Sequence, residues 1–270
     1  MDGDFMRIVS LCPSNTEILV CLGLMNQIVG VDHYSDWPKT VKNLPDLGPD
    51  LHINMEKVVQ LQPDLIVASK SVPGMEKVVE QVRELNIPYL VLEPYHLEDI
   101  FDNIIEVGIA TERLRKAKQV VDEMKAKIEW ISERVPKFER AIKLYWEWWP
   151  KPVISPGEKN WLTDVSEIVG AKNIFAAYPH PNIQTDWERV AQESPDYVLA
   201  VWTGIPIKQV NIDRIISRPA WQGKRFVERD RVHILEEAWF CRPSPRLITG
   251  IEHLAHILYP KRFSEATSFL

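Results

Sequence analysis

The chain has 270 residues, of which 45% are hydrophobic and 26% charged, and its formal net charge at pH 7 is −6. This length is too great for one small core and is sufficient for two lobes of roughly 120 residues each. The acidic balance and the absence of a basic block argue against nucleic acid as a partner. No apolar run approaches the roughly 20 residues that a membrane-spanning helix requires.

The cysteines and the first residues bear on the cellular compartment. Cys12, Cys21 and Cys241 are odd in number and lack metal-ligand spacing, so we expect free thiols, with a Cys12–Cys21 disulfide as the alternative. Residues 1–7 do not combine a cationic region with an apolar core, so they do not form a signal peptide. The sequence therefore predicts either a cytoplasmic protein or an exported protein written without its signal.

The first 110 residues alternate short strands with helices. Residues 7–11 form the first predicted strand, and a helix follows in which Ser14 and Glu17 have the spacing of a capping box. A second strand at 28–31 leads into a polar and aromatic loop at 32–38, which is either a binding loop or a plain surface turn. Helices and strands then alternate at 55–61, 64–68, 74–85, 89–92 and 97–110. Such alternation predicts a mostly parallel sheet covered by helices.

A long amphipathic helix is predicted from Thr111 to Val135, where the sequence has no Gly or Pro. Its apolar residues recur at steps of three and four, and Pro136 ends the pattern. At 1.5 Å per residue, about 25 residues span roughly 37 Å. A coiled coil is the alternative, although the apolar stripe runs for little more than three heptads. We interpret this helix as a strut that joins two lobes and keeps their relative movement small.

The chain repeats one unit on either side of the predicted strut. Residues 54–68 and 186–200 align without a gap, and the identical pairs are Glu56/Glu188, Val58/Val190, Gln60/Gln192, Pro63/Pro195, Asp64/Asp196 and Ala68/Ala200. The second half also has predicted strands and helices at 140–147, 161–169, 211–217, 232–235 and 245–258. The sequence thus predicts an N-terminal α/β lobe, a connecting helix and a C-terminal α/β lobe, at 1–110, 111–136 and 137–270.

Several segments together resemble one known family, the substrate-binding proteins of class III ABC importers, which carry vitamin B12, haem or iron siderophores. The segments that carry the resemblance are 7–11, 13–17, 34–38, 54–56, 63–66, 239–240 and 244–246. The resemblance implies an α/β fold of two Rossmann-like lobes with mostly parallel sheets, joined by one long backbone helix, with the ligand in the cleft between them. The Tyr-Ser-Asp loop and the Trp-Phe loop are most similar to the vitamin B12 (cobalamin) branch.

The resemblance implies a set of residues that line the ligand cleft, namely Tyr34, Trp239, Phe240 and Arg242. Aromatic faces can lie against a corrin, and indole or guanidinium donors can meet its amide oxygens. The sequence departs from the B12 branch in three places: Cys241 replaces an acidic residue, Asp50 replaces a tryptophan and Ser69 replaces an aromatic residue.

The second half of the chain supplies further aromatic candidates, because eight of the ten tryptophans follow residue 136. We add Trp148, Trp149 and Trp202 to the cleft set, together with Cys241, which could act as a soft ligand to a metal centre. For each tryptophan the alternative is a place in the core. Trp148 and Trp149 are the best exception, because neighbouring bulky residues cannot both point into one face of a sheet.

Two glutamates match positions where the family contacts its transporter. The resemblance implies that Glu56 and Glu188, one on each lobe, form salt bridges with arginines of the ABC transporter membrane subunits. The repeat is consistent with this role, because a two-fold permease needs one anionic contact from each lobe. The alternative is that both are ordinary first-turn glutamates, which the helix macrodipole favours.

Enzymatic alternatives find little support in the sequence, which has no Gly-rich phosphate loop, nucleophile elbow or zinc pattern. His253 and His256 share a helix face, and we expect them to be surface residues. We therefore expect a monomeric binding protein with no catalytic residue, no metal site and no resident cofactor, which captures cobalamin or a similar metal chelate. The alternatives are an iron-siderophore or haem binding protein of the same fold, or an intracellular corrinoid- or tetrapyrrole-handling protein or chelatase-like enzyme.

Overall fold

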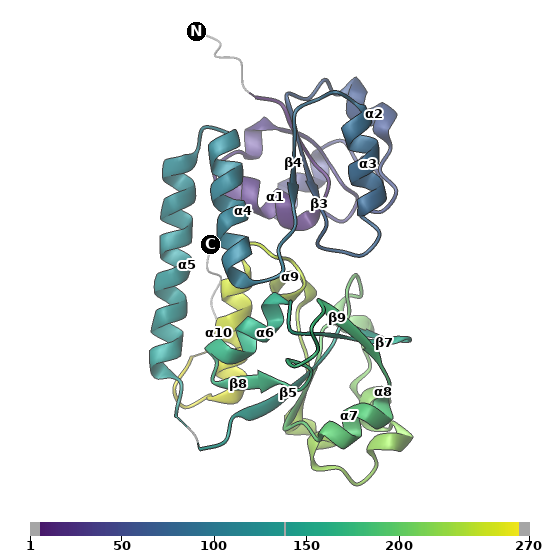
Figure 1. Ribbon diagram of the computed structural model, residues 1–270, viewed down its shortest axis with the longest axis vertical. Helices are drawn as coiled ribbons and strands as arrows, with labels where there is room; N and C mark the ends of the chain where they lie inside the picture. The colour runs from purple at the N-terminus through teal and green to yellow at the C-terminus, as the bar shows by residue number, and fades with distance from the viewer. Residues whose placement is uncertain (1–5, 138, 265–270) are drawn as a thin grey trace.

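The computed structural model describes residues 6–137 and 139–264. Two α/β lobes lie one above the other, and the long helix α5 (Leu114–Arg134) runs along one side of the molecule beside them (Figure 1). None of the helices in the described part of the chain has the length and apolar character needed to cross a membrane. The predicted two-lobed α/β class is confirmed.

The N-terminal lobe is built on a four-stranded parallel sheet of order β2-β1-β3-β4. Its strands are β1 (Ile8–Ser10), β2 (Ile28–Val31), β3 (Leu65–Ser69) and β4 (Tyr89–Leu92). β1 and β3 are buried at every position, which explains why they are runs of apolar residues rather than alternating patterns. The helices of this lobe are α1 (Pro13–Cys21), α2 (Met55–Gln60), α3 (Glu76–Glu84) and α4 (Leu97–Ala110), with 3-10 turns at Met25–Gln27 and Lys39–Asn43.

The predicted capping box at the start of α1 is wrong. Cys12 is the N-cap residue and makes no side-chain cap, and Pro13 occupies the first turn, where its missing N–H costs nothing. The Glu17 carboxylate instead accepts hydrogen bonds from Arg242, Ser244 and Arg246 of the other lobe. Charge-assisted bonds to two guanidinium groups are stronger than a bond to one backbone N–H, so the tertiary contact prevails over the local one.

The strut begins three residues later than the sequence predicts. Glu112 has a φ of 58°, which interrupts the helical backbone between α4 and α5. The apolar face of α5 is buried at Ala117, Val120, Val121, Met124 and Ile131, and it packs against α4, α6 and α10. At one crossing a Cβ on Gly108 would lie 2.4 Å from the Cβ of Ala117, so only glycine allows this approach of α4 to α5.

The C-terminal lobe has a second four-stranded parallel sheet, of order β11-β10-β5-β8. Its strands are β5 (Ile142–Glu147), β8 (Ala171–Asn173), β10 (Tyr197–Ala200) and β11 (Val232–Ile234). The helices are α6 (Trp161–Ile168), α7 (Trp187–Glu193), α8 (Ile212–Ile216), α9 (Glu237–Phe240) and α10 (Leu247–Leu258), with 3-10 turns at Ile207–Gln209, Pro219–Trp221, Arg225–Val227 and Arg229–Arg231.

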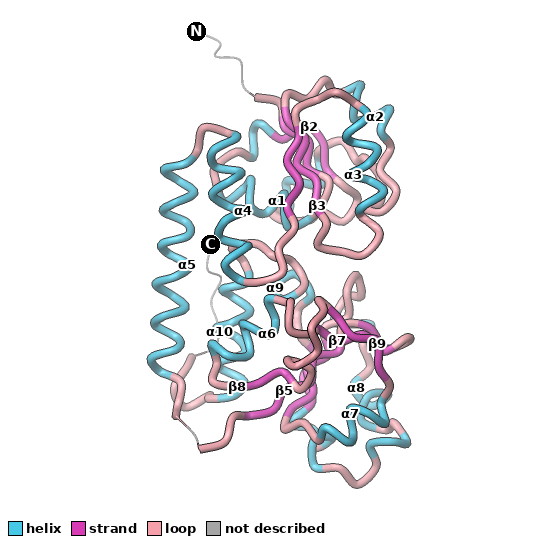
Figure 2. Tube along the Cα trace, in the orientation of Figure 1, coloured by secondary structure: helices cyan, strands magenta, loops and turns pink. Residues whose placement is uncertain are grey.

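A small antiparallel sheet that the sequence did not predict lies beside this lobe. It has the order β6-β7-β9 and consists of β6 (Trp149–Pro150), β7 (Val153–Pro156) and β9 (Asn182–Thr185) (Figure 2). These strands are two to four residues long, and β6 and β7 each contain a proline, so their sequence resembles a loop.

The internal repeat corresponds to the same helix–strand unit in both lobes, α2 with β3 and α7 with β10. Each helix begins with a side-chain cap. The Asn54 side chain accepts from the N–H of Lys57, and the Asp186 side chain accepts from the N–H of Arg189. The repeated aspartate then ties the following strand to its neighbour. Asp64 Oδ2 accepts from the N–H of Arg7 at 2.7 Å.

The equivalent contact in the second lobe joins Asp196 Oδ2 to the N–H of Lys143 at 2.8 Å. The backbone N–H of each aspartate donates in return, to the carbonyl oxygen of Arg7 in one lobe and of Lys143 in the other. The sequence identity between residues 54–68 and 186–200 therefore reflects one local structure used twice.

One hydrophobic core runs through both lobes and the strut. The cluster that includes Ile8 of β1 also includes Ile104 of α4, Met124 of α5, Leu144 of β5 and Leu254 of α10. Two smaller clusters lie on the outer faces of the two sheets. Because the lobes share their main core, a large change in their relative position would expose apolar surface, at roughly 25 cal/mol per Å².

Candidate functional site

The two parallel sheets point their carboxyl ends toward each other (Figure 1). Side chains from loops at these ends meet across the boundary, as in the contact of Asp36 after β2 with Arg242 after α9. In open α/β sheets, ligands bind outside the carboxyl ends of the strands. We call the loops at these two edges the interlobe site.

The loop after β2 carries an aromatic side chain on a backbone that hydrogen bonds hold in place. Asp32 is 1% exposed and accepts from the N–H of Tyr34 at 2.8 Å and from Ser35 Oγ at 2.6 Å. Ser35 Oγ is 2.7 Å from Thr16 Oγ1, which is 2.7 Å from Ser10 Oγ, so a chain of buried hydroxyls continues behind the loop. Tyr34 is 48% exposed. The backbone of this loop is therefore fixed while its aromatic ring remains available.

Burial of Asp32 gives the protein a predictable pH dependence. Burial raises the pKa of Asp32 from 3.8 to about 6, although hydrogen bonds from Ser35 and the Tyr34 N–H oppose the rise. Because the native state binds this proton more tightly than the unfolded chain, the stabilisation is complete below about pH 4 and is lost as pH rises through about 6.

As the pH rises from about 4 to about 7, the free energy of unfolding of Asp32→Asn should therefore fall less than that of the wild type. The difference should be roughly 3 kcal/mol for a shift of two pKa units. Urea unfolding at each pH measures this difference. Asp46→Asn removes a carboxyl whose pKa is lowered by His33, so it should change the dependence of the free energy of unfolding on pH in the direction opposite to that of Asp32→Asn. Parallel profiles for Asp32→Asn and the wild type would contradict the assignment.

The tryptophans expected at the site divide into exposed and packed rings. Trp149 is 38% exposed and its Nε1 donates to the Lys151 carbonyl at 2.9 Å. Trp202, after β10, is partly buried, and its Nε1 donates to Glu147 Oε1 at 3.0 Å. Trp148 and Trp239 are partly buried, with the first packed at 5.7 Å from Trp161 and the second at 5.6 Å from His253.

Two predicted cleft residues have other roles in the structure. Phe240 is 0% exposed, and its ring lies 5.5 Å from that of Trp146, so it belongs to the core rather than to a ligand surface. The Arg242 side chain is 10% exposed and is engaged by the carboxylates of Glu17, Asp36 and Glu237. Its terminal nitrogens therefore link the lobes, while its Nε is buried without a hydrogen-bond partner among the described residues.

The three cysteines are free thiols, so the alternative of a Cys12–Cys21 disulfide is not formed. Cys241 is partly buried beside Thr203 Oγ1, at 3.6 Å, and the Val201 carbonyl, at 3.5 Å. Burial raises the pKa of the Cys241 thiol well above its ordinary value of 9.0. Within the described part of the chain, no group of three or more His, Cys, Asp or Glu residues is placed to hold a metal ion.

Glu56 and Glu188 occupy equivalent positions in the two lobes. Each is exposed and is the second residue of its helix, Glu56 in α2 and Glu188 in α7. Figure 1 shows both helices on the side of the molecule away from α5. The repeat therefore places one exposed carboxylate on each lobe.

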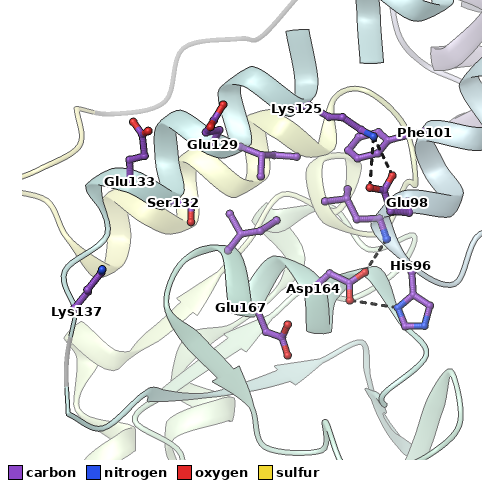
Figure 3. Close-up of a pocket in the computed structure, with 13 residues that line it drawn as sticks. His96, Glu98, Phe101, Lys125, Glu129, Ser132, Glu133, Lys137, Asp164 and Glu167 are labelled. Atoms are coloured by element: carbon purple, nitrogen blue, oxygen red, sulfur yellow. Dashed lines mark hydrogen bonds and ion pairs between the residues drawn. The ribbon is translucent and has the colours of Figure 1, made fainter. Parts of the chain in front are cut away.

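A groove of about 880 Å³ lies on the flank of the molecule, outside the interlobe site. It is lined by residues of α4, α5 and α6, among them Phe101, and Figure 3 shows its ion pairs. Lys125 Nζ lies 3.2 Å from Glu98, and Asp164 of α6 accepts from the Leu97 N–H at 2.7 Å, at the start of α4. The Lys125–Glu98 pair joins α5 to α4, and the Asp164 contact fastens α6 of the second lobe to α4 of the first.

Two lobes sharing a core, with aromatic rings on loops between their sheets, define a two-lobed ligand-binding protein. The family model described as periplasmic binding protein matches residues 8–238, and the chain belongs to this family. It is a substrate-binding protein of the ABC-importer type, as the sequence resemblance predicted, and family members are binding proteins rather than enzymes.

Three known proteins illustrate the relationship. The uncharacterized ABC transporter substrate-binding lipoprotein YvrC of Bacillus subtilis strain 168 is 30% identical over 96% of this chain and 82% of its own length. The vitamin B12-binding protein of Yersinia pseudotuberculosis strain YPIII is 26% identical over 92% of this chain and 84% of its own. A possible iron-binding periplasmic solute-binding protein of Staphylococcus epidermidis has a TM-score of 0.80 and 28% identity, covering 95% of this chain and 100% of its own. The family is extracytoplasmic.

Proposed function

We propose that this protein captures cobalamin or a similar metal chelate at the interlobe site and delivers it to the membrane subunits of an ABC importer. The observation that carries the proposal is the placement of aromatic side chains at both sheet edges, with the exposed Tyr34 after β2 and the partly buried Trp202 after β10. Flat rings of this kind bury the apolar face of a large organic ligand. The vitamin B12-binding relative is consistent with this class of ligand.

An iron chelate is the second candidate, because one structural neighbour is described as a possible iron-binding protein. Both candidates place the ligand between the lobes and require no bond chemistry. We propose that the protein acts outside the cytoplasm, in keeping with its lipoprotein and periplasmic relatives, and that it works as a monomer.

Delivery is proposed to depend on Glu56 and Glu188. Their equivalent positions on the two lobes provide one carboxylate for each half of a two-fold permease. An exposed carboxylate at a helix N-terminus is favoured by the macrodipole and is available to accept charge-assisted hydrogen bonds from arginines of a partner.

A tryptophan-fluorescence titration tests ligand capture. Cyanocobalamin, hydroxocobalamin, haem and a ferric hydroxamate are added in turn, with correction for inner-filter absorption. We expect saturable quenching by the cobalamins. Tyr34→Ala should reduce the binding free energy by about 2 kcal/mol, the loss typical of a central aromatic contact.

Tyr89→Ala is the matched control, because Tyr89 is 39% exposed at the opposite, amino end of β4. It should bind as the wild type does. Quenching by the ferric hydroxamate alone would favour the iron chelate instead. A response to none of the four compounds would refute the proposed ligand class.

A further inference from the structure

We propose that Glu17 determines the charge of the ligand that the interlobe site accepts, because it occupies two arginines that would otherwise bind an anionic ligand. The inference rests on the proposed function and deepens it. The ligand class is a neutral or cationic chelate, without carboxylates that need a guanidinium partner.

Glu17 is a buried carboxylate of the first lobe whose partners all come from the second. It is 1% exposed on α1. Its Oε1 accepts from Arg246 at 2.6 Å and from Arg242 at 3.0 Å, and its Oε2 accepts from Ser244 Oγ at 2.5 Å. An isolated buried carboxylate would be very costly, so the two arginines and Glu17 require one another.

Two further carboxylates complete the neutralisation of Arg242. Asp36 Oδ1 lies 2.6 Å from its first terminal nitrogen, and Glu237 Oε2 lies 3.2 Å from the second. Three carboxylates thus face two guanidinium groups, and the cluster carries one net negative charge when all are ionised. The Arg246 guanidinium also lies over the Trp37 ring, 4.8 Å from its centroid.

The same pairing recurs at the neighbouring strand ends. Lys70, after β3, lies 2.9 Å from Glu93, after β4. The buried Asp32 and the partly buried Asp50 add acidic groups to the first lobe, and burial raises the pKa of each. A ligand carboxylate at this edge meets cations that already have partners, and must displace a carboxylate to reach them. A neutral, amide-rimmed or cationic chelate avoids this repulsion.

The test is a gain of binding, which a purely structural role would not produce. Glu17→Gln keeps the shape of the side chain and removes the negative charge that both arginines contact. Asp36→Asn removes one negative charge that faces Arg242. The Asp36 side chain is 43% exposed, so this variant should fold even if Glu17→Gln does not. Cyanocobalamin, haem and ferric citrate serve as one neutral and two anionic probes.

We expect affinity for haem and ferric citrate to rise about tenfold in either variant, the scale of one hydrogen bond to a charged group. Affinity for cyanocobalamin should change less. Asp213→Asn is the matched control, because it removes an equal charge from an exposed residue of α8, and it should leave all three affinities unchanged.

The two proposals fail in different ways. If a folded variant shows no gain of affinity for the anionic probes, the proposed role of Glu17 is overturned, whatever the wild type binds. Wild-type affinity for haem or ferric citrate equal to that for cyanocobalamin also overturns it, while leaving ligand capture intact. Wild-type protein that binds no probe, with variants that gain anionic binding, supports the role of Glu17 and refutes the proposed ligand class.

Discussion

Reversing the charge of Glu56 and Glu188 together is expected to abolish delivery of the ligand while leaving its capture unchanged. Both carboxylates are exposed in the first turns of α2 and α7, and both helices lie on the side away from the strut (Figure 1). Like-charge contacts across an interface cost several kcal/mol. Two of them should lower transport by at least about a hundredfold.

Uptake into liposomes that contain the reconstituted importer measures delivery, and fluorescence quenching measures capture in the same preparations. The variant Glu80→Lys with Glu167→Lys is the control, because it changes one exposed glutamate on each lobe and gives the same net charge. This control should transport normally. Normal transport by the Glu56 and Glu188 double variant would show that docking uses another surface.

Replacing Arg218 by methionine is expected to destabilise the protein by about 3–5 kcal/mol, because it leaves a buried carboxylate without its counter-ion. Arg218 donates to both oxygens of Glu147, at 2.5 Å and 2.7 Å, and neither side chain is more than 4% exposed. The guanidinium carbon also lies over the rings of Trp187 and Trp221, 4.3 Å and 4.4 Å from their centroids.

Urea unfolding measures the loss, and an exposed pair provides the control. Arg229 and Asp213 lie 2.5 Å apart with both side chains 69% exposed, so Arg229→Met should cost less than about 1 kcal/mol. Combining Arg218→Met with Glu147→Leu should recover part of the lost stability, because no unpaired charge remains. Equal effects of Arg218→Met and Arg229→Met would contradict the prediction.

The Arg218–Glu147 pair also connects the stability of the second lobe to its binding surface. Glu147 ends β5 and accepts from Trp202 Nε1, so the orientation of this ring depends on a carboxylate that the arginine holds in place. No pattern in the sequence indicated this pair, because Arg218 and Glu147 are 71 positions apart and neither lies in a recognisable motif.

The residues selected for the candidate site differ in where the structure places them. Tyr34 was selected by resemblance, and it is exposed in the loop that follows β2. Phe240 was selected by resemblance, but it follows Trp239 on the short helix α9 and faces the core. Arg242 was selected by resemblance as a ligand donor, whereas in the structure its guanidinium pairs with three carboxylates from separate segments. The sequence alone could not show that they converge.

The alternation of helices and strands, the strut and the repeat could be read from the amino-acid sequence, because apolar periodicity and helix caps act between residues close along the chain. The aspartate after each repeated helix is visible in the same alignment, although its contacts lie 57 and 53 positions away. Which charges neutralise one another became visible only in the folded chain. Glu17 has the spacing of a local cap, yet it binds arginines more than 220 positions away, because two guanidinium groups of the other lobe stabilise its buried charge more than one backbone N–H does.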